Sequence, residues 1–313
     1  LVKKGDVSAL ELLEIAIARS NAVNPSVNCV VEELFDYARA AIKAGLPQGP
    51  FTGVPFMLKD LGMALKGTVT TNGSRFFKDA RMDYSSTVVE RYQRAGLVIF
   101  GKTASPEFGG TGTTESILFG DTRNPWDLSR SAGGSSGGSA VAVATGILPL
   151  ANATDGGGSI RIPASCCGLF GMKPSRGRVP SGPIDLSSTM SVIHAVSRSV
   201  RDSAALLDAT CGDYPQQLMK LPAPVRSYLD ETRQDPGGLR IAFSFDPGLG
   251  KTLHAENRKA LEATTRALAA LGHELVEVKL PLPPESFVAS YASLIAADVA
   301  GTLRLAPMLV GHE

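Results

Sequence analysis

The chain has 313 residues, 43% of them hydrophobic, which is enough for one large globular domain or two of medium size. Its formal net charge is +1, with no basic stretch and no acidic tail, so the composition argues against nucleic-acid binding and against a disordered partner segment. The 4 cysteines lack paired C-x-x-C spacing, so we expect no zinc site and a reducing, cytoplasmic compartment.

Neither end of the sequence resembles a targeting or membrane segment. No window offers about 20 consecutive apolar residues, so we expect no transmembrane helix and no role at a membrane. The first residues lead into a polar segment, not into the apolar core of a signal peptide. Because the sequence begins without Met and stops without a clear terminal element, we expect it to be part of a longer chain.

Apolar spacing, capping residues and glycines predict the elements of the first half. In chain order we expect a helix at about 8–20 that opens with a capping box, a helix at about 32–43, a strand at 54–58, a helix at 84–95, a strand at 97–100 and an irregular stretch at 101–135. Long irregular stretches inside compact domains are usually functional.

The second half alternates helices and strands. We expect a small-residue helix at 139–147, a strand after Pro149, a strand at 169–173, a helix at 200–210, a polar connection at about 213–237, a strand at 239–243, a helix at 254–271 and a strand at 275–278. This alternation predicts an α/β fold with a largely parallel or mixed sheet covered by helices.

Two clusters of glycine and serine stand out, at 133–139 and 155–164. Glycine lets the backbone approach a ligand closely, and serine supplies a hydroxyl that can act as a nucleophile or a proton relay. Taken alone, the first cluster is equally compatible with a flexible linker and the second with a glycine turn. A buried helix directly after the first cluster favours a functional loop.

The familiar serine-based sites do not fit these clusters. Residues 133–137 formally match the G-x-S-x-G nucleophile elbow, but the preceding run is typical of a loop, and no histidine lies in a recognisable loop motif. No S-x-x-K sequence occurs either. What remains is a serine hydrolase that uses lysine as its base.

Lys59 is the candidate base, because it directly follows the apolar strand expected at 54–58. Burial behind such a strand removes solvation, which lowers the pKa of a lysine toward the value that a base needs. Asp60 would oppose that shift if it lay close, but successive side chains of an extended strand point to opposite faces. Taken alone, a residue such as Lys59 is more often a surface lysine at a strand end.

These residues together resemble the amidase signature family, and the resemblance covers about residues 8 to 212. The matching segments, in the family's order and at similar spacing, are 51–60 (FTGVPFMLKD), 123–127 (RNPWD), 133–139 (GGSSGGS), 155–165 (DGGGSIRIPAS), 168–174 (GLFGMKP) and 197–202 (SRSVRD). Within the family, the sequences of these segments are similar to those of bacterial amidases of the nylon-oligomer cyclic-dimer hydrolase type.

The resemblance implies a Ser–cis-Ser–Lys triad. Ser159 would be the nucleophile, Ser135 the bridging serine after a cis peptide, and Lys59 the general base. Ser136 is the competing choice for the bridge, but Ser135 lies 24 residues before Ser159, as in the family pattern.

The same resemblance assigns supporting roles. Backbone N–H groups of Gly156, Gly157, Gly158 and Ser159 would form the oxyanion hole. Asp155 and Arg161 would support the glycine loop structurally. Gly110, Thr111 and Ser136 are expected on the substrate side. Some relatives carry asparagine where this chain has Gly110, so their substrate is not transferred.

The resemblance implies a single amidase domain, residues 1–313, that continues beyond the C-terminus shown, with the N-terminus left open. The usual fold is a large mixed β-sheet with helices on both faces. We expect an amidase that needs no metal or cofactor and acts on a small linear or cyclic amide, with a homodimer left open. One alternative is a glutamine-hydrolysing, ammonia-supplying subunit of a tRNA-dependent amidotransferase, and another is a non-catalytic binding homologue, disfavoured because all triad residues are present.

Overall fold

The computed structural model describes residues 1–183, 190–214, 217, 219–248, 250–279 and 284–310. The chain divides into two compact units. The first consists of Leu1–Thr232 with Gly301–Glu313, and the second of Arg233–Ala300. The single amidase domain implied by the resemblance stays a prediction.

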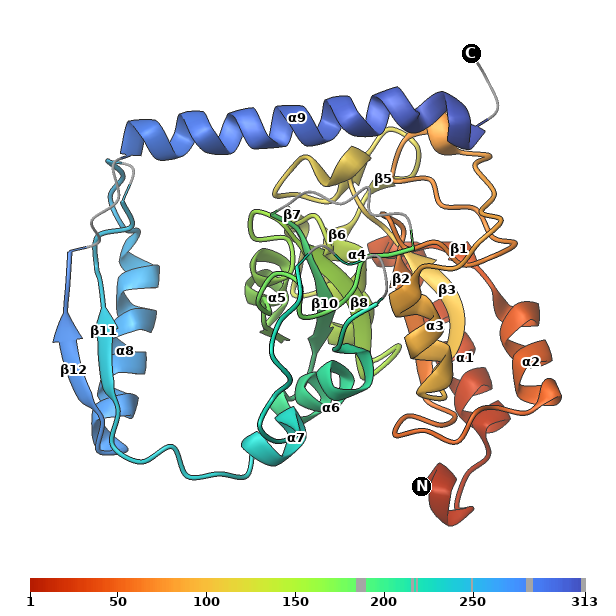
Figure 1. Ribbon diagram of the computed structural model, residues 1–313, viewed down its shortest axis with the longest axis horizontal. Helices are drawn as coiled ribbons and strands as arrows, with labels where there is room; N and C mark the ends of the chain where they lie inside the picture. The colour runs from red at the N-terminus through yellow and green to blue at the C-terminus, as the bar shows by residue number, and fades with distance from the viewer. Residues whose placement is uncertain (184–189, 215–216, 218, 249, 280–283, 311–313) are drawn as a thin grey trace. The chain divides into compact units, whose positions relative to one another are not determined.

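The first unit contains most of the helices and strands (Figure 1). They are η1 (Val2–Lys4), α1 (Ala9–Val27), β1 (Val30–Glu33), α2 (Phe35–Ala44), β2 (Pro55–Lys59), η2 (Arg75–Phe77), α3 (Thr87–Arg94), β3 (Val98–Thr103), η3 (Glu107–Gly109), β4 (Glu115–Ser116), β5 (Gly120–Asp121), β6 (Arg123–Asn124), β7 (Asp127–Ser131), α4 (Gly137–Ala144), β8 (Leu150–Asp155), α5 (Arg161–Cys167), β9 (Phe170–Gly171), β10 (Val192–Ser197), α6 (Val200–Thr210) and α7 (Tyr228–Glu231), where η denotes a short 3-10 helix.

Two three-stranded sheets form the centre of this unit. In the first, β3 pairs antiparallel with β1 and parallel with β2. In the second, β10 pairs antiparallel with β8 and with β9. The α/β class is confirmed. The expected large sheet is divided between β2 and β8, where the Lys59 N–H donates to the Asn152 side-chain Oδ1 at 3.0 Å in place of a backbone ladder.

Side chains alternate between the two faces of these strands, and each face carries its own core. On one face, Met57, Phe100 and Ala151 pack in a cluster with residues of α1, α4 and α5. On the other face, Phe56 and Ile99 pack with residues of α3 and α6. Helices therefore cover both faces of the strands, as the fold class predicts.

The helix starts are set by local capping. Ser8 and Glu11 form the predicted capping box, in which Ser8 N–H donates to Glu11 Oε2 at 2.8 Å and Glu11 N–H donates to Ser8 Oγ at 3.1 Å. The helix continues past the expected end to Val27, and Asn28 in the left-handed conformation ends it. The expected irregular stretch at 101–135 contains the short pairs β4–β5 and β6–β7.

The second unit follows the predicted order of strand, helix and strand. β11 (Arg240–Phe243) pairs parallel with β12 (Glu274–Glu277), and α8 (Ala255–Ala270) connects them. Parallel neighbours need such a crossover. The final helix, α9 (Pro284–Val310), contributes residues to both units.

One stretch of α9 differs from the expectation of no membrane-spanning helix. Ser286–Arg304 is long and apolar enough, by length and composition alone, to cross a membrane, and none of it is buried. The expectation rests on an uninterrupted apolar run, whereas an averaged window tolerates Asp298 and Arg304. A single helix of this kind is weak evidence for a membrane span.

Candidate active site

Lys59 is the last residue of β2 and is fully buried. Its Nζ donates to Ser135 Oγ at 2.7 Å and to Thr154 Oγ1 at 2.9 Å. The structure therefore brings together two of the three predicted catalytic residues, which lie 76 positions apart in the sequence. The interpretation of Lys59 as a surface lysine is wrong.

Burial lowers the pKa of Lys59 from its ordinary value of 10.5 to about 7, and the negative charge of Asp155 works in the opposite direction. Desolvation is the larger effect because the ammonium group has only hydroxyl partners within hydrogen-bonding distance among the described residues. A pKa near neutrality gives a substantial fraction of uncharged amine, the form that can accept a proton.

Ser135 lies in the turn that precedes α4, and the Gly134–Ser135 peptide bond is cis. The turn packs tightly against the stretch before β4, because a Cβ atom at Gly134 would lie 2.1 Å from the Thr113 carbonyl oxygen. Only glycine fits at this position. Thr114 Oγ1 donates to the Gly133 carbonyl at 2.8 Å and accepts from the Gly137 N–H at 3.0 Å, which holds the turn from both sides.

Ser136, the competing choice for the bridge, is hydrogen-bonded to β8 and not to Lys59. Its side chain is fully buried, its Oγ donates to the Thr154 carbonyl at 3.3 Å, and the Thr154 N–H donates back to it at 3.4 Å. Ser136 therefore attaches the turn to β8. Because Lys59 Nζ bonds to Ser135, the geometry favours Ser135 as the bridge, and the substrate-side role of Ser136 stays a prediction.

Ser159 lies in the glycine turn between β8 and α5 and is half-buried. No hydrogen bond joins its Oγ to Ser135 among the described residues. The backbone N–H groups of Gly156 and Gly157 make no hydrogen bond within this part of the chain, so they are available to an oxyanion. The Gly158 N–H, in contrast, donates to Asp155 Oδ1 at 2.7 Å, so its predicted role in the oxyanion hole is wrong for this arrangement.

Asp155 ends β8 and fixes the glycine turn. It accepts from the Ile160 N–H at 3.2 Å, and Arg161 contacts both carboxylate oxygens, Nε to Oδ2 at 2.9 Å and Nη2 to Oδ1 at 3.0 Å. Burial alone raises the pKa of Asp155, but the bonds from Arg161, Gly158 and Ile160 outweigh it and hold the pKa below its usual value. These contacts correspond to the supporting roles predicted for Asp155 and Arg161.

Gly109, which precedes the predicted substrate-side residues Gly110 and Thr111, lies against Ser135. A Cβ atom at Gly109 would lie 3.1 Å from Ser135 Oγ and 2.7 Å from Leu61 Cδ2, and its φ of +66° also favours glycine. Gly110 follows with its N–H bonded to the Glu107 carbonyl at 3.1 Å. Thr111 is exposed, and its hydroxyl donates to the Thr113 carbonyl at 3.1 Å.

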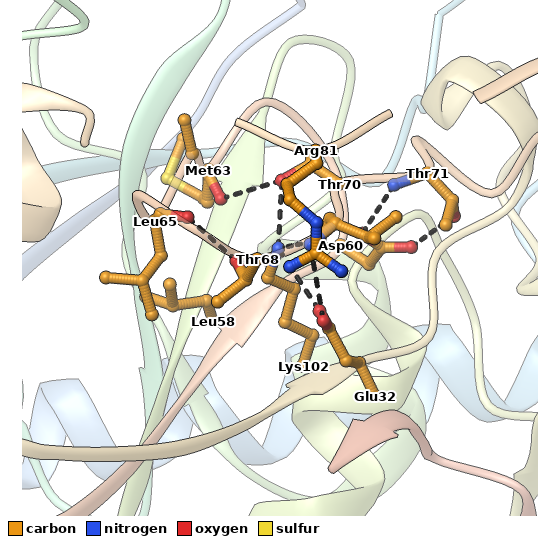
Figure 2. A network of polar contacts seen from close by, with 12 residues as sticks. Glu32, Leu58, Asp60, Met63, Leu65, Thr68, Thr70, Thr71, Arg81 and Lys102 are labelled. Atoms are coloured by element: carbon orange, nitrogen blue, oxygen red, sulfur yellow. Dashed lines mark hydrogen bonds and ion pairs between the residues drawn. The ribbon is translucent and has the colours of Figure 1, made fainter. Parts of the chain in front are cut away.

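Asp60 belongs to a separate polar network (Figure 2). Its carboxylate accepts from the Thr71 N–H at 2.9 Å and from the Thr71 hydroxyl. Lys102, also fully buried, contacts the Val69 carbonyl and lies 3.3 Å from Glu32 Oε2. As strand alternation indicates, Asp60 makes its contacts away from Lys59. Burial raises the pKa of Asp60 to about 6, and the charge of Lys102 partly offsets the shift.

Sequence reasoning missed two residues of β8 that support Lys59. Thr154 accepts from its side chain, and Asn152 accepts from its backbone N–H. Asn152 Nδ2 also donates to Tyr92 Oη at 3.1 Å, which ties α3 to the site. The available signal was the alternation of Asn152 and Thr154 with Ala151 and Ala153 just before the glycine cluster.

On this α/β fold a buried lysine is hydrogen-bonded to one serine, Ser135, and a second serine, Ser159, lies in the glycine turn after β8. A family model described as Amidase matches residues 11–308, and the chain belongs to this amidase family.

Named relatives agree with this assignment. The 6-aminohexanoate-cyclic-dimer hydrolase of Paenarthrobacter ureafaciens is 40% identical over 320 aligned positions, covering 100% of this chain and 64% of the relative. The A subunit of glutamyl-tRNA(Gln) amidotransferase from a strain of Prochlorococcus marinus is 37% identical over 310 positions, covering 96% of this chain and 63% of the relative. The chain thus spans less than two thirds of the length of either relative.

Solved structures agree with the family assignment. The structure of 6-aminohexanoate cyclic dimer hydrolase complexed with substrate matches with a TM-score of 0.94 at 38% identity, covering 100% of this chain and 66% of that one. A bacterial aryl acylamidase of the amidase signature family matches with a TM-score of 0.87 at 32% identity, covering 97% of this chain and 65% of that one.

Proposed function

We propose that the protein hydrolyses a carboxylic amide C–N bond through an acyl-enzyme on Ser159, with Ser135 as the bridging serine and Lys59 as the general base. The observation that carries the proposal is the 2.7 Å hydrogen bond between Ser135 Oγ and a fully buried lysine whose pKa lies near 7. Family membership supports the same chemistry.

Proton transfer begins at the lysine. A neutral amine keeps two N–H groups and one lone pair. Lys59 Nζ can therefore accept the Ser135 hydroxyl proton while it still donates to Thr154 Oγ1. Ser135 in turn takes the proton of Ser159 as the Ser159 oxygen attacks the amide carbon. Lys59 becomes an ammonium group in this step.

The attack places negative charge on the former carbonyl oxygen. Donors for this charge are the N–H groups of Gly156 and Gly157, which have no partner among the described residues, together with that of Ser159 itself. Each donor of this kind contributes roughly 3 kcal/mol to the stability of the transition state. Asp155 holds the turn in place through Gly158 without occupying these donors.

The C–N bond then breaks as Lys59 returns its proton through Ser135 to the leaving amine. Water then attacks the ester carbon of the acyl-enzyme and gives one proton through Ser135 to Lys59. As the ester C–O bond breaks, this proton returns through Ser135 to the Ser159 oxygen, and the carboxylic acid is released. Every proton and bond is accounted for by the substrate, one water and the two serines with Lys59.

The substrate we propose is a small linear or cyclic amide. The relative that is 40% identical carries the name of a 6-aminohexanoate-cyclic-dimer hydrolase, which makes a cyclic amide one candidate. Gly110 offers no side chain as a polar clamp, so we leave the identity of the amide open. A cytoplasmic location and a homodimer remain predictions.

A glutamine-hydrolysing, ammonia-supplying subunit is the second candidate, because an amidotransferase chain of this kind is 37% identical to this one. It is less well supported, because the cyclic-dimer hydrolase is 40% identical over the full chain. An amidase turns over simple amides alone, whereas the ammonia-supplying protein would need glutamine and its partner.

A panel of acyl p-nitroanilides, with mass spectrometry of the protein during turnover, tests the proposal. We expect release of p-nitroaniline and a protein mass raised by one acyl group. Ser159→Ala should abolish both signals, and Ser129→Ala, at an exposed serine of β7, should leave both unchanged. Turnover by Ser159→Ala at the wild-type rate would contradict the acyl-enzyme assignment.

A further inference from the structure

Ile162 is a large apolar side chain that remains exposed beside the catalytic turns. It is the second residue of α5, and 38% of its surface is accessible. Among the described residues it is the exposed large apolar side chain of the segment 155–165, which also holds Ser159. The mechanism above assigns it no role.

The contacts of Ile162 place its tip at the junction of three glycine-containing stretches. Its Cδ1 lies 2.6 Å from the position of a Cβ at Gly158 and 4.0 Å from that of a Cβ at Gly112. Its Cγ2 lies 3.2 Å from the position of a Cβ at Gly133. These stretches carry the nucleophile turn, the predicted substrate side and the turn of the bridging serine, respectively.

Ile162 packs against Gly158, the residue that directly precedes Ser159. The Ile162 N–H donates to the Gly158 carbonyl at 2.7 Å, which closes a turn over residues 158–162 at the start of α5. Side chains at helical positions also lean toward the N-terminus and cover the preceding turn. Ile162 therefore lies over the turn that holds Ser159.

We propose that Ile162 is a specificity-determining residue that forms an apolar wall of the substrate site beside Ser159. The inference rests on the proposed amide hydrolysis and adds to it a substrate class, amides that carry an alkyl or other apolar group next to the scissile bond. The wall favours such groups because their contact with Ile162 removes apolar surface of both from water.

The effect should be visible as a preference between substrates. A hydrophobic pocket discriminates about 10–200-fold for one methylene group. An exposed wall lies at the low end of this range, so removal of the Ile162 side chain beyond Cβ should reduce the preference for a longer alkyl chain by about 10-fold.

The test compares kcat/KM ratios within each variant, because a ratio cancels any loss of active protein. One series varies the acyl chain at a constant leaving group, from acetyl to hexanoyl p-nitroanilide. The other varies the amine at a constant acetyl group, from N-methyl to N-hexyl acetamide. The variants are Ile162→Ala, Ile162→Gln and, as a matched control, Ile15→Ala at an exposed isoleucine of α1.

We expect Ile162→Ala and Ile162→Gln to lower the long-to-short ratio about 10-fold in one of the two series, and Ile15→Ala to keep the wild-type ratio. The series that responds shows whether the wall faces the acyl or the amine side. An active wild type whose ratios stay within about 2-fold in both variants would overturn the assignment of Ile162 alone. A wild type that hydrolyses no member and forms no acyl-enzyme would overturn the proposed function and this inference with it.

Discussion

Burial of Lys59 has two consequences at the residue scale. It removes the ammonium group from water, which brings its pKa to about 7, and it limits the partners of Nζ to two hydroxyl groups among the described residues. A lysine with an ordinary pKa of 10.5 would be almost fully protonated at neutral pH and could accept nothing. Desolvation is therefore what makes this lysine a base.

The pH dependence of turnover follows from this. Protonated Lys59 has no lone pair, so we expect kcat/KM of the wild type to fall about tenfold per pH unit below an apparent pKa of about 7 and to level off above it. Initial rates on one p-nitroanilide across pH 5–9 measure this decline of kcat/KM on the acid side. A flat profile over that range would exclude a titrating lysine as the base.

Substitution of the lysine separates its charge from its basicity. Lys59→Ala removes the base and should lower kcat/KM by roughly 10²–10⁴. Lys59→Arg keeps a cation that cannot be deprotonated in proteins, so it should lose about as much. Near-normal turnover by either variant at neutral pH, with the fold checked by circular dichroism, would rule out Lys59 as the base.

At the scale of elements, β8 connects the site to the helices. Asn152 lies in the middle of this strand and accepts a hydrogen bond from the Lys59 N–H. Its own amide donates to Tyr92 Oη of α3 and to the His194 carbonyl of β10. All these residues are buried. Asn152 therefore replaces a backbone ladder between β2 and β8 and fixes the distance between Lys59 and the turn after β8.

Tyr92 tests this connection. Tyr92→Phe removes the acceptor at 3.1 Å and should lower the free energy of unfolding by about 1 kcal/mol. Tyr37→Phe is the matched control, because half-buried Tyr37 accepts from Gln93 Nε2 at 2.9 Å where water can substitute, and its cost should be smaller. Urea midpoints measure both. Equal costs for the two variants would argue against a buried connection through Asn152.

Local signals predicted some elements well and left out others. The α6 bounds, Val200–Thr210, and the capping of α1 at Ser8 follow from residues close in sequence, which the pattern contains. β10 and α9 were not predicted. The six buried residues of β10 include the polar His194, whose ring Nε2 lies 2.6 Å from Ser203 Oγ of α6, a contact that the local sequence pattern does not contain.

The candidate site likewise combines residues that the sequence predicts with residues whose roles depend on the fold. Lys59, Ser135 and Ser159 could be predicted because the family resemblance supplied their roles, and the structure brings the first two together. The roles of Asn152 and Ser136 depend on how β2, β8 and the turn before α4 meet in space. No spacing within the sequence contains that information.

At the scale of the whole molecule, buried titratable groups make stability depend on pH. Burial lowers the pKa of His194 to about 4 from its ordinary 6.5, so the unfolded chain binds this proton more readily than the folded one. The stability that His194 contributes is full above pH 6.5 and is lost as the pH falls toward 4. Asp60, with its pKa raised from 3.8 to about 6, has the opposite effect over much of the same range.

Because the two groups oppose each other, the effect of His194 has to be isolated by comparing how the free energy of unfolding changes with pH in wild type and in a His194 variant. Between pH 7 and pH 4 the wild type should lose up to about 3 kcal/mol more than His194→Gln, which has no titrating group at this position. Urea unfolding at both pH values, with Asp60→Asn as the variant expected to shift in the other direction, measures it. The same pH dependence in wild type and His194→Gln would show that His194 titrates normally.

The central claim is that Ser159 is the nucleophile, activated through Ser135 by Lys59. Labelling with a fluorophosphonate, followed by peptide mapping, tests it most directly, because the reagent stays on the attacking oxygen. We predict that the adduct lies on Ser159, that Ser159→Ala is not labelled, and that Lys59→Ala is labelled much more slowly. An adduct on Ser135, or labelling that persists in Ser159→Ala, would contradict the account.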